Sequence, residues 1–198
     1  SCVALQVATN WFNDALDFIK GGDTAARIGP RRITASGLVP ARSVMIAAVL
    51  MLAAAAALAV PLFLARGWPI VVIGIPSLYF CYGYTGGPYA DPTNGLGQLF
   101  GRLFFGLGAV TGSTFVQTGQ WHVEALTGGL QIGCLSTVLI AVNNLRDVLE
   151  DRQTGKRTLA VRLGIGFARR EIYVLALAPY VIGLWWIANG HELAFALP

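Results

Sequence analysis

Charged residues are scarce in this chain of 198 residues, and their scarcity excludes most classes of soluble protein. Asp, Glu, Lys and Arg make up 12% of the residues, whereas a soluble domain carries about 25%. Hydrophobic residues make up 55% and gather into long uncharged runs. A helix needs about 20 apolar residues to cross a bilayer. The composition therefore predicts an all-α, multi-span transmembrane helix bundle in a lipid bilayer.

Cysteine and histidine are also rare, which leaves few ligands for a transition metal. The three cysteines match no metal-binding spacing, so buried thiols are expected rather than disulfides. His122 and His191 fall on the predicted outer side of the membrane, away from the acidic motifs described below. The chain does not begin with Met and lacks a basic leader, so we expect a fragment without a signal peptide.

Six apolar stretches are expected to form helices, separated by Gly, Pro and charged residues. They cover residues 1–20, 43–65, 68–84, 96–117, 125–147 and 168–188. The fourth is rich in glycine, and a face of small residues lets helix backbones approach closely in lipid. We expect one transmembrane domain over residues 1–198, incomplete at both ends.

The basic residues predict the topology. They concentrate in the connections 20–42, 85–97 and 148–167 and at the adjoining helix ends, and only Arg66 falls elsewhere. Loops rich in Lys and Arg remain in the cytoplasm. The net charge of +4 therefore reflects membrane topology, and no nucleic-acid partner is expected.

Two polar motifs end apolar segments on that predicted cytoplasmic side. The first consists of Asn10, Asn13, Asp14 and Asp17, which share an arc of about 100° on one helix face. The second contains Asn143, Asp147 and Asp151, which recur every four residues and drift by only about 80°. Each motif thus presents a column of oxygen atoms in one direction.

The oxygen columns predict a magnesium site shared between two helices. Carboxylates in a membrane segment cost a few kcal/mol each unless they pair or line a cavity. Mg²⁺ prefers oxygen ligands and is often held by a few carboxylates together with substrate phosphates. The expected metal ligands are Asp14, Asp17, Asp147 and Asp151. The alternative is that both motifs are helix ends that reach solvent, with their acids solvated or paired with Arg146.

Basic and amide side chains near the motifs predict binding of a diphosphate. Arginine and lysine recognise phosphate oxygens well. The candidates are Lys20, Arg27, Arg32, Asn143, Asn144, Lys156 and Arg157. The alternative is that the basic residues only set the topology. The long connection 21–40 is a candidate lid over the diphosphate. Asp23 within it is expected to cap a short helix, and metal binding is the alternative.

Four stretches of the sequence resemble the UbiA superfamily of intramembrane aromatic prenyltransferases. They are residues 9–24 (TNWFNDALDFIKGGDT), 27–39 (RIGPRRITASGLV), 84–88 (YTGGP) and 143–164 (NNLRDVLEDRQTGKRTLAVRLG). The resemblance implies that the six predicted helices correspond to helices two to seven of a nine-helix bundle. Within the superfamily, the four stretches most resemble the branch that prenylates 1,4-dihydroxy-2-naphthoate in menaquinone synthesis.

The resemblance also implies a reaction. Mg²⁺ would bridge the two Asp motifs to a polyprenyl diphosphate, with Asn10 and Asn13 in the same site. The aromatic ring of 1,4-dihydroxy-2-naphthoate would attack the allylic carbon and lose carbon dioxide, giving demethylmenaquinone. Tyr82 and Tyr84 could stabilise the allylic cation or simply lie at the membrane interface. The implied location is a bacterial inner membrane.

Three alternatives stay open at this point. The phylloquinone and 4-hydroxybenzoate branches of the same superfamily would share the two motifs. A cation transporter would use the acidic columns as an ion path, but no predicted span carries a charge near its middle. In a purely structural membrane subunit the acidic residues would be replaceable.

Overall fold

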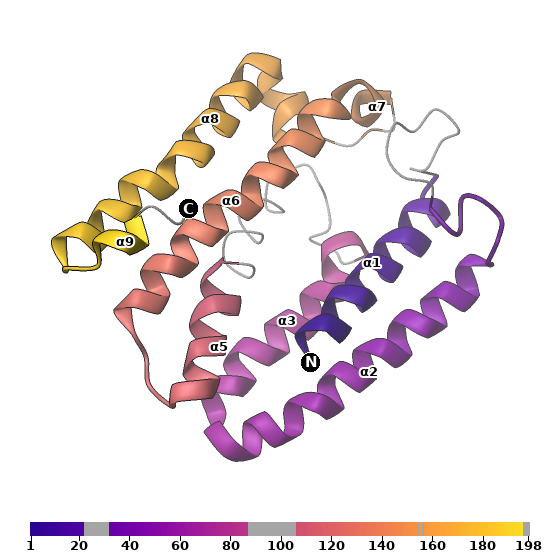
Figure 1. The fold of residues 1–198 in the computed structure, drawn as a ribbon. Helices are drawn as coiled ribbons and strands as arrows, with labels where there is room; N and C mark the ends of the chain where they lie inside the picture. The colour runs from indigo at the N-terminus through magenta and orange to yellow at the C-terminus, as the bar shows by residue number, and fades with distance from the viewer. Residues whose placement is uncertain (22–31, 87–105, 154, 156, 196–198) are drawn as a thin grey trace. The chain divides into compact units, whose positions relative to one another are not determined.

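The structure is a computed structural model that describes residues 1–21, 32–86, 106–153, 155 and 157–195. Every regular element within these ranges is a helix, which confirms the predicted all-α class (Figure 1). The chain divides into two compact units, Ser1–Asp91 and Pro92–Pro198, and each is considered by itself. The expectation of a single domain over residues 1–198 stays a prediction.

The first unit is a packed trio of helices. It contains α1 (Cys2–Ile19), α2 (Ala41–Arg66) and α3 (Trp68–Gly86), and each of them contacts the other two. Ala8, Phe12 and Leu16 recur every four residues on one face of α1, and they meet Ala48 of α2 and Cys81 of α3 in the core. This apolar face fixes α1 between its neighbours, so the polar residues of its last turns are held at one end of the trio.

The second unit is built around the pairing of α6 (Val123–Arg146) with α8 (Leu159–Ala188). A π-helical turn at residues 106–108 leads into α5 (Ala109–Thr118), which packs on α6. Two short helices complete the unit, α7 (Val148–Gln153) and α9 (Glu192–Phe195). Residues 96–105 of the fourth predicted span lie outside the described residues.

The connection expected at residues 148–167 is largely helical. It contains α7 and the first turns of α8, which begins at Leu159 rather than near residue 168. Charged residues such as Arg162 do not oppose a helix, because arginine is a good helix former. Within α8 the backbone leaves helical geometry at Gly164, whose φ of 87° is costly for any residue with a side chain. The sequence signal for a loop was polarity, and polarity alone does not stop a helix.

A buried amide joins the two long helices of the second unit. Gln131 of α6 donates from Nε2 to the carbonyl oxygen of Pro179 in α8 over 2.8 Å. Its Oε1 accepts a hydrogen bond from the indole Nε1 of Trp186, also at 2.8 Å. Both halves of the amide are therefore satisfied, as a polar group inside an apolar helix pair requires.

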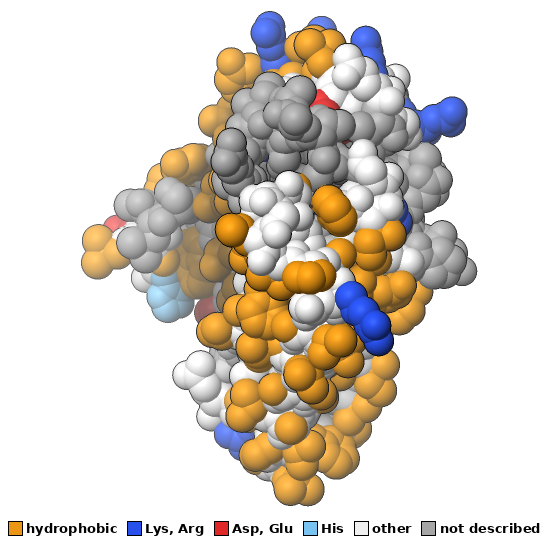
Figure 2. All heavy atoms as spheres, turned by 90° about the vertical axis from the view of Figure 1, so that its right-hand side faces the viewer, with side chains coloured by type: hydrophobic (Ala, Val, Ile, Leu, Met, Phe, Trp, Pro, Cys, Tyr) orange, Lys and Arg blue, Asp and Glu red, His pale blue; other side chains and the backbone are white. Residues whose placement is uncertain are grey.

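Three of the described helices are long and apolar enough to cross a membrane, namely α2, α6 and α8. In α3 the apolar part, Trp68–Gly83, is shorter. Hydrophobic side chains cover much of the face drawn in Figure 2. Many large hydrophobic side chains of the described residues are exposed, among them Leu64 of α2 and Val181 of α8. Such a surface suits lipid rather than water. The chain is an integral membrane protein.

Gly106 brings two backbones together in the second unit, as expected from the glycine-rich span. A Cβ atom at Gly106 would lie 2.3 Å from the carbonyl oxygen of Gly129 and 2.5 Å from the Cα atom of Gly133. No side chain fits at those distances, and both neighbours are backbone atoms that cannot rotate away. The close approach of the 106–108 turn to α6 therefore depends on glycine.

We predict that Gly106→Ala lowers the free energy of unfolding by about 1–3 kcal/mol, as overpacking does in a filled core. Thermal unfolding in detergent measures the change. Gly128→Ala is the matched control, because a Cβ atom there would meet only Trp186 Cζ2, at 4.0 Å. Equal stability of the two variants would contradict the close approach.

Candidate functional site

Asp14 is the most enclosed acid of the first motif, with 8% of its surface exposed. Its Oδ2 accepts a hydrogen bond from the backbone N–H of Ile33 at 3.1 Å, and its Oδ1 accepts one from the N–H of Thr34 at 3.2 Å. The hydroxyl of Thr34 donates to the carbonyl oxygen of Asp14 at 3.1 Å. Three hydrogen bonds thus dock the segment that precedes α2 onto the last turns of α1.

Asp17 lies one turn further along α1 and carries an ion pair. Arg32 Nη2 is 2.9 Å from Asp17 Oδ2, and both side chains are largely buried. Arg32, a predicted diphosphate ligand, is therefore placed directly at the first motif. In this arrangement the guanidinium balances the charge of the Asp17 carboxylate.

Thr85, in the last turn of α3, connects two further predicted site residues. Its hydroxyl donates to Asn13 Oδ1, and its carbonyl oxygen accepts a hydrogen bond from Lys20 Nζ. The end of α3 thereby holds the amide and the lysine that flank Asp14 and Asp17. Asn10 is exposed and begins the column on the outside of α1.

An aromatic pair lies beside the first motif. The ring of Tyr82 meets the ring of Phe12 edge to face, with centroids 5.5 Å apart. Phe12 is buried in the core, whereas the Tyr82 side chain is partly exposed. The side chain of Tyr84 lies outside the described residues.

The second motif keeps its predicted register across a helix junction. Although α6 ends at Arg146, the N–H of Asp147 donates to the carbonyl oxygen of Asn143 at 2.9 Å. The N–H of Asp151 in turn donates to the carbonyl oxygen of Asp147 at 2.8 Å. The i to i+4 hydrogen bonds therefore continue into α7, and Asn143, Asp147 and Asp151 form the expected column.

Each acid of the second motif is engaged. Arg146 donates two hydrogen bonds to Asp147, from Nε to Oδ1 at 2.6 Å and from Nη2 to Oδ2 at 2.7 Å. Asp151 is buried and accepts a hydrogen bond from the hydroxyl of Thr158 at 3.4 Å, just before α8 begins. The motif is thus tied to both neighbouring helices.

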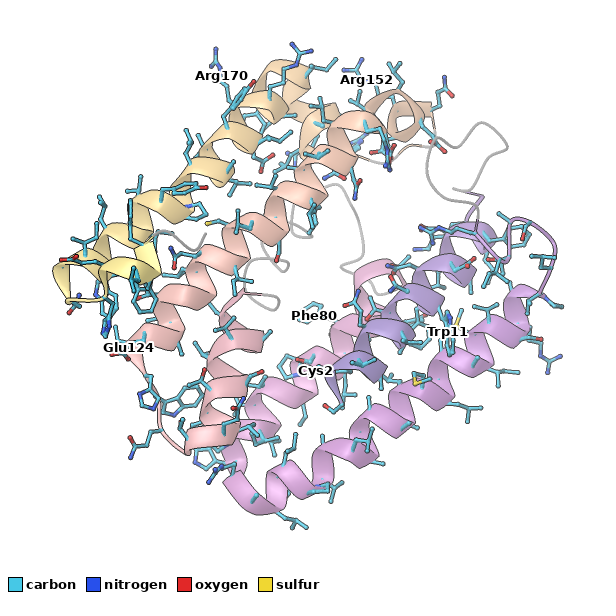
Figure 3. All side chains as sticks on the ribbon, viewed as in Figure 1. Cys2, Trp11, Phe80, Glu124, Arg152 and Arg170 are labelled. Atoms are coloured by element: carbon cyan, nitrogen blue, oxygen red, sulfur yellow. The ribbon has the colours of Figure 1, made fainter. Side chains whose placement is uncertain are left out.

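The remaining predicted site residues of the second unit are less enclosed. Asn143 and Arg157 are exposed, and Asn144 is half-buried. Figure 3 shows Arg152 of α7 and Arg170 of α8 at the end of this unit that carries the motif, with Glu124 at the other end of α6. Arg27, Asp23 and Lys156 lie outside the described residues. Because Arg152, Arg157 and Arg170 lie near the motif-bearing end, the surroundings of the second motif are basic.

Neither motif is a complete metal site by itself. Among the residues that the structure describes, no three His, Cys, Asp or Glu side chains are placed to hold a metal ion. The oxygen donors nevertheless suit Mg²⁺, which needs only one or two carboxylates and keeps several waters. A carboxylate oxygen that accepts one hydrogen bond also retains capacity for a further ligand. Because the motifs belong to different units, their sharing of one site stays a prediction.

Three threonines contribute contacts that the motifs did not predict. Thr34, Thr85 and Thr158 each place a hydroxyl on a motif residue. All three lie in stretches that resemble the prenyltransferase superfamily. A threonine in a predicted connection, however, does not indicate by itself which residue its hydroxyl will contact. Their contacts arise from tertiary packing.

Comparisons with known proteins extend over the whole chain. Residues 1–198 match the UbiA prenyltransferase family. The chain is 30% identical over 190 residues to the 1,4-dihydroxy-2-naphthoate octaprenyltransferase of Bacillus subtilis (strain 168), covering 96% of this chain and 60% of the relative. It is 36% identical over 196 residues to the protein of the same name in Escherichia coli (strain K12), covering 96% of this chain and 64% of the relative.

A third relative of the same name, from Mycobacterium leprae (strain TN), is 34% identical over 180 residues. That alignment covers 91% of this chain and 61% of the relative. The chain therefore spans less than two thirds of the length of these curated relatives. No solved structure matches it.

We predict that Thr85→Val lowers the free energy of unfolding by about 1 kcal/mol, because Asn13 Oδ1 loses its hydroxyl donor in a partly buried place. Chemical unfolding in detergent measures the change. The control is Ser77→Ala on the same helix, whose hydroxyl donates over 2.7 Å to a carbonyl of its own helix, that of Ile73. A larger loss for the control than for Thr85→Val would contradict the bridge between α3 and α1.

Proposed function

The chain belongs to the UbiA prenyltransferase family, and from that membership we propose that the protein transfers a polyprenyl group from a polyprenyl diphosphate to 1,4-dihydroxy-2-naphthoate. The observation that carries the proposal is that both carboxylate columns keep their register at helix ends, each with an arginine on one acid. Such an end offers oxygen ligands for a metal ion and guanidinium groups for phosphate.

The acceptor is proposed from the relatives. Three relatives that are 30–36% identical over most of the chain are named 1,4-dihydroxy-2-naphthoate octaprenyltransferases. Ring attack on the allylic carbon would break the bond to diphosphate, and loss of the carboxylate as carbon dioxide would restore aromaticity. The product would be demethylmenaquinone in its reduced form, together with diphosphate.

Mg²⁺ is the proposed cofactor, held by Asp14, Asp17, Asp147 and Asp151. When bound, it would supply positive charge against the leaving diphosphate. The protein's own cations would act beside it: Arg32 lies on Asp17, and Lys20 is held by Thr85 at the same end of α1. A diphosphate carries more negative charge than a single carboxylate and has enough oxygen atoms to accept hydrogen bonds from both cations at once.

The packing beside the first motif suits a short-lived allylic cation. Phe12 directly precedes Asn13 in α1, and its ring packs edge to face against that of Tyr82 from α3. The proposed reaction needs apolar surroundings of this kind, because water would otherwise capture the cation. The ring face of Tyr82 could also attract the positive charge directly.

The proposed location is a bacterial inner membrane, with both motifs on the cytoplasmic side. The support is the charge distribution, because several of the described arginines lie in or next to the motifs, as Arg32, Arg146 and Arg152 do, whereas Arg66 lies in the last turn of α2. Loops and helix ends that carry such charge remain in the cytoplasm.

We predict that Asp147→Asn lowers prenyl transfer at least about 100-fold, because the variant loses a negative charge that would hold the cation at the diphosphate. The assay uses membranes that contain the intact protein, with a polyprenyl diphosphate, 1,4-dihydroxy-2-naphthoate and Mg²⁺. Glu124→Gln is the matched control at the other end of α6 and should retain activity. Full activity of Asp147→Asn would exclude the proposed site.

We also predict that metal removal abolishes turnover. A chelator such as EDTA should stop product formation, and added Mg²⁺ should restore it, because the carboxylates alone repel the diphosphate. Extraction of the lipids and mass spectrometry identify the prenylated naphthol. Undiminished transfer after exhaustive chelation would show that the acids serve another purpose.

A further inference from the structure

Thr34 has an unusual environment for a residue of a surface connection. It is only 3% exposed, whereas its apolar neighbour Ile33 is 44% exposed. Ala35, Ser36 and Gly37 are exposed as well. Burial of apolar surface would favour the opposite arrangement, with the isoleucine inside. The chain therefore turns its hydroxyl inward and its aliphatic side chain outward.

The buried hydroxyl of Thr34 donates a hydrogen bond to Asp14. Thr34 contacts that one residue twice, through Oγ1 to the main-chain carbonyl oxygen at 3.1 Å and through its N–H to Oδ1 at 3.2 Å. The N–H of Ile33 holds the other carboxylate oxygen at 3.1 Å. Because two consecutive N–H groups hold the two oxygens, rotation of the carboxylate is restricted, while each oxygen keeps a lone pair for another ligand.

The same docking determines where Arg32 lies. Arg32 precedes Ile33 directly, so once residues 33 and 34 are bound to Asp14, the guanidinium reaches Asp17 one turn away, at 2.9 Å. We name residues 32–34 the clasp. Within the clasp, the hydrogen bond from the Thr34 hydroxyl can be removed by a side-chain substitution that leaves the charge unchanged.

We propose that Thr34 is a positioning residue, which acts through Asp14 and through the clasp to fix the first acidic motif for its substrate. The role rests on the function proposed above, since the substrate is the metal-bound polyprenyl diphosphate. Thr34 itself touches no reacting atom. It sets the orientation of one carboxylate and the location of one guanidinium, both before the ligand arrives.

The test compares three variants of the intact protein in membranes. Thr34→Val keeps the shape and the N–H but lacks the hydroxyl, and it should raise KM for the polyprenyl diphosphate about five- to tenfold, with kcat within about twofold of the original protein. Thr34→Ser restores the hydroxyl and should recover KM. Ser77→Ala is the matched control, because its hydroxyl lies outside the clasp and donates to the carbonyl oxygen of Ile73 in its own helix, at 2.7 Å.

A second measurement does not depend on activity. Amide hydrogen exchange at residues 33 and 34, without substrate, should quicken in Thr34→Val and in Asp14→Asn but not in Ser77→Ala. If the unaltered protein forms no prenylated naphthol, the proposed function fails, and the exchange rates alone then decide the role of Thr34. Unchanged exchange in Thr34→Val, or a loss of kcat that Thr34→Ser does not recover, would overturn the proposal.

Discussion

Every carboxylate that the protein carries near lipid must be satisfied by the protein itself. Water is absent from the core of a bilayer, and an unpaired charge there costs several kcal/mol. The four motif acids have three kinds of partner. Backbone N–H groups bind Asp14, an arginine pairs with each of Asp17 and Asp147, and a threonine hydroxyl donates to Asp151. Several of these partners lie in the connections next to the motifs, so the conformation of those connections determines whether the acids are paired.

The helices themselves could be predicted from the sequence, because apolar runs and glycine breaks are local signals. The first motif follows directly from them: once Ala8, Phe12 and Leu16 face the core, the polar positions of α1 have a fixed direction. The second motif also kept its predicted column, since the i to i+4 hydrogen bonds survive the junction at Asp147. The prediction from charged residues was wrong for the connection expected at residues 148–167, much of which is helical.

The partners of the acids could not be predicted, because they are set by tertiary contacts. Arg32 was one of several basic residues in a long connection, and nothing in its neighbours distinguished it as the partner of Asp17. Thr34 carried still less signal, since its role depends on which way a turn faces. The pairing of Arg146 with Asp147 was foreseen only as an alternative to metal binding.

Those two descriptions of the acids, paired with arginine or holding a metal, are compatible once charge is considered for the whole site. An acid paired with a guanidinium is neutral as a pair, so neither Asp17 nor Asp147 needs a metal to balance its charge. A metal–diphosphate complex brings both signs of charge at once. If Mg²⁺ binds these acids as proposed, Asp17 and Asp147 would hold it, and Arg32 and Arg146 would be placed to bind phosphate oxygens. No charge need then stand alone, so the ion pairs seen in the structure are suitable resting partners for a site that binds such a complex.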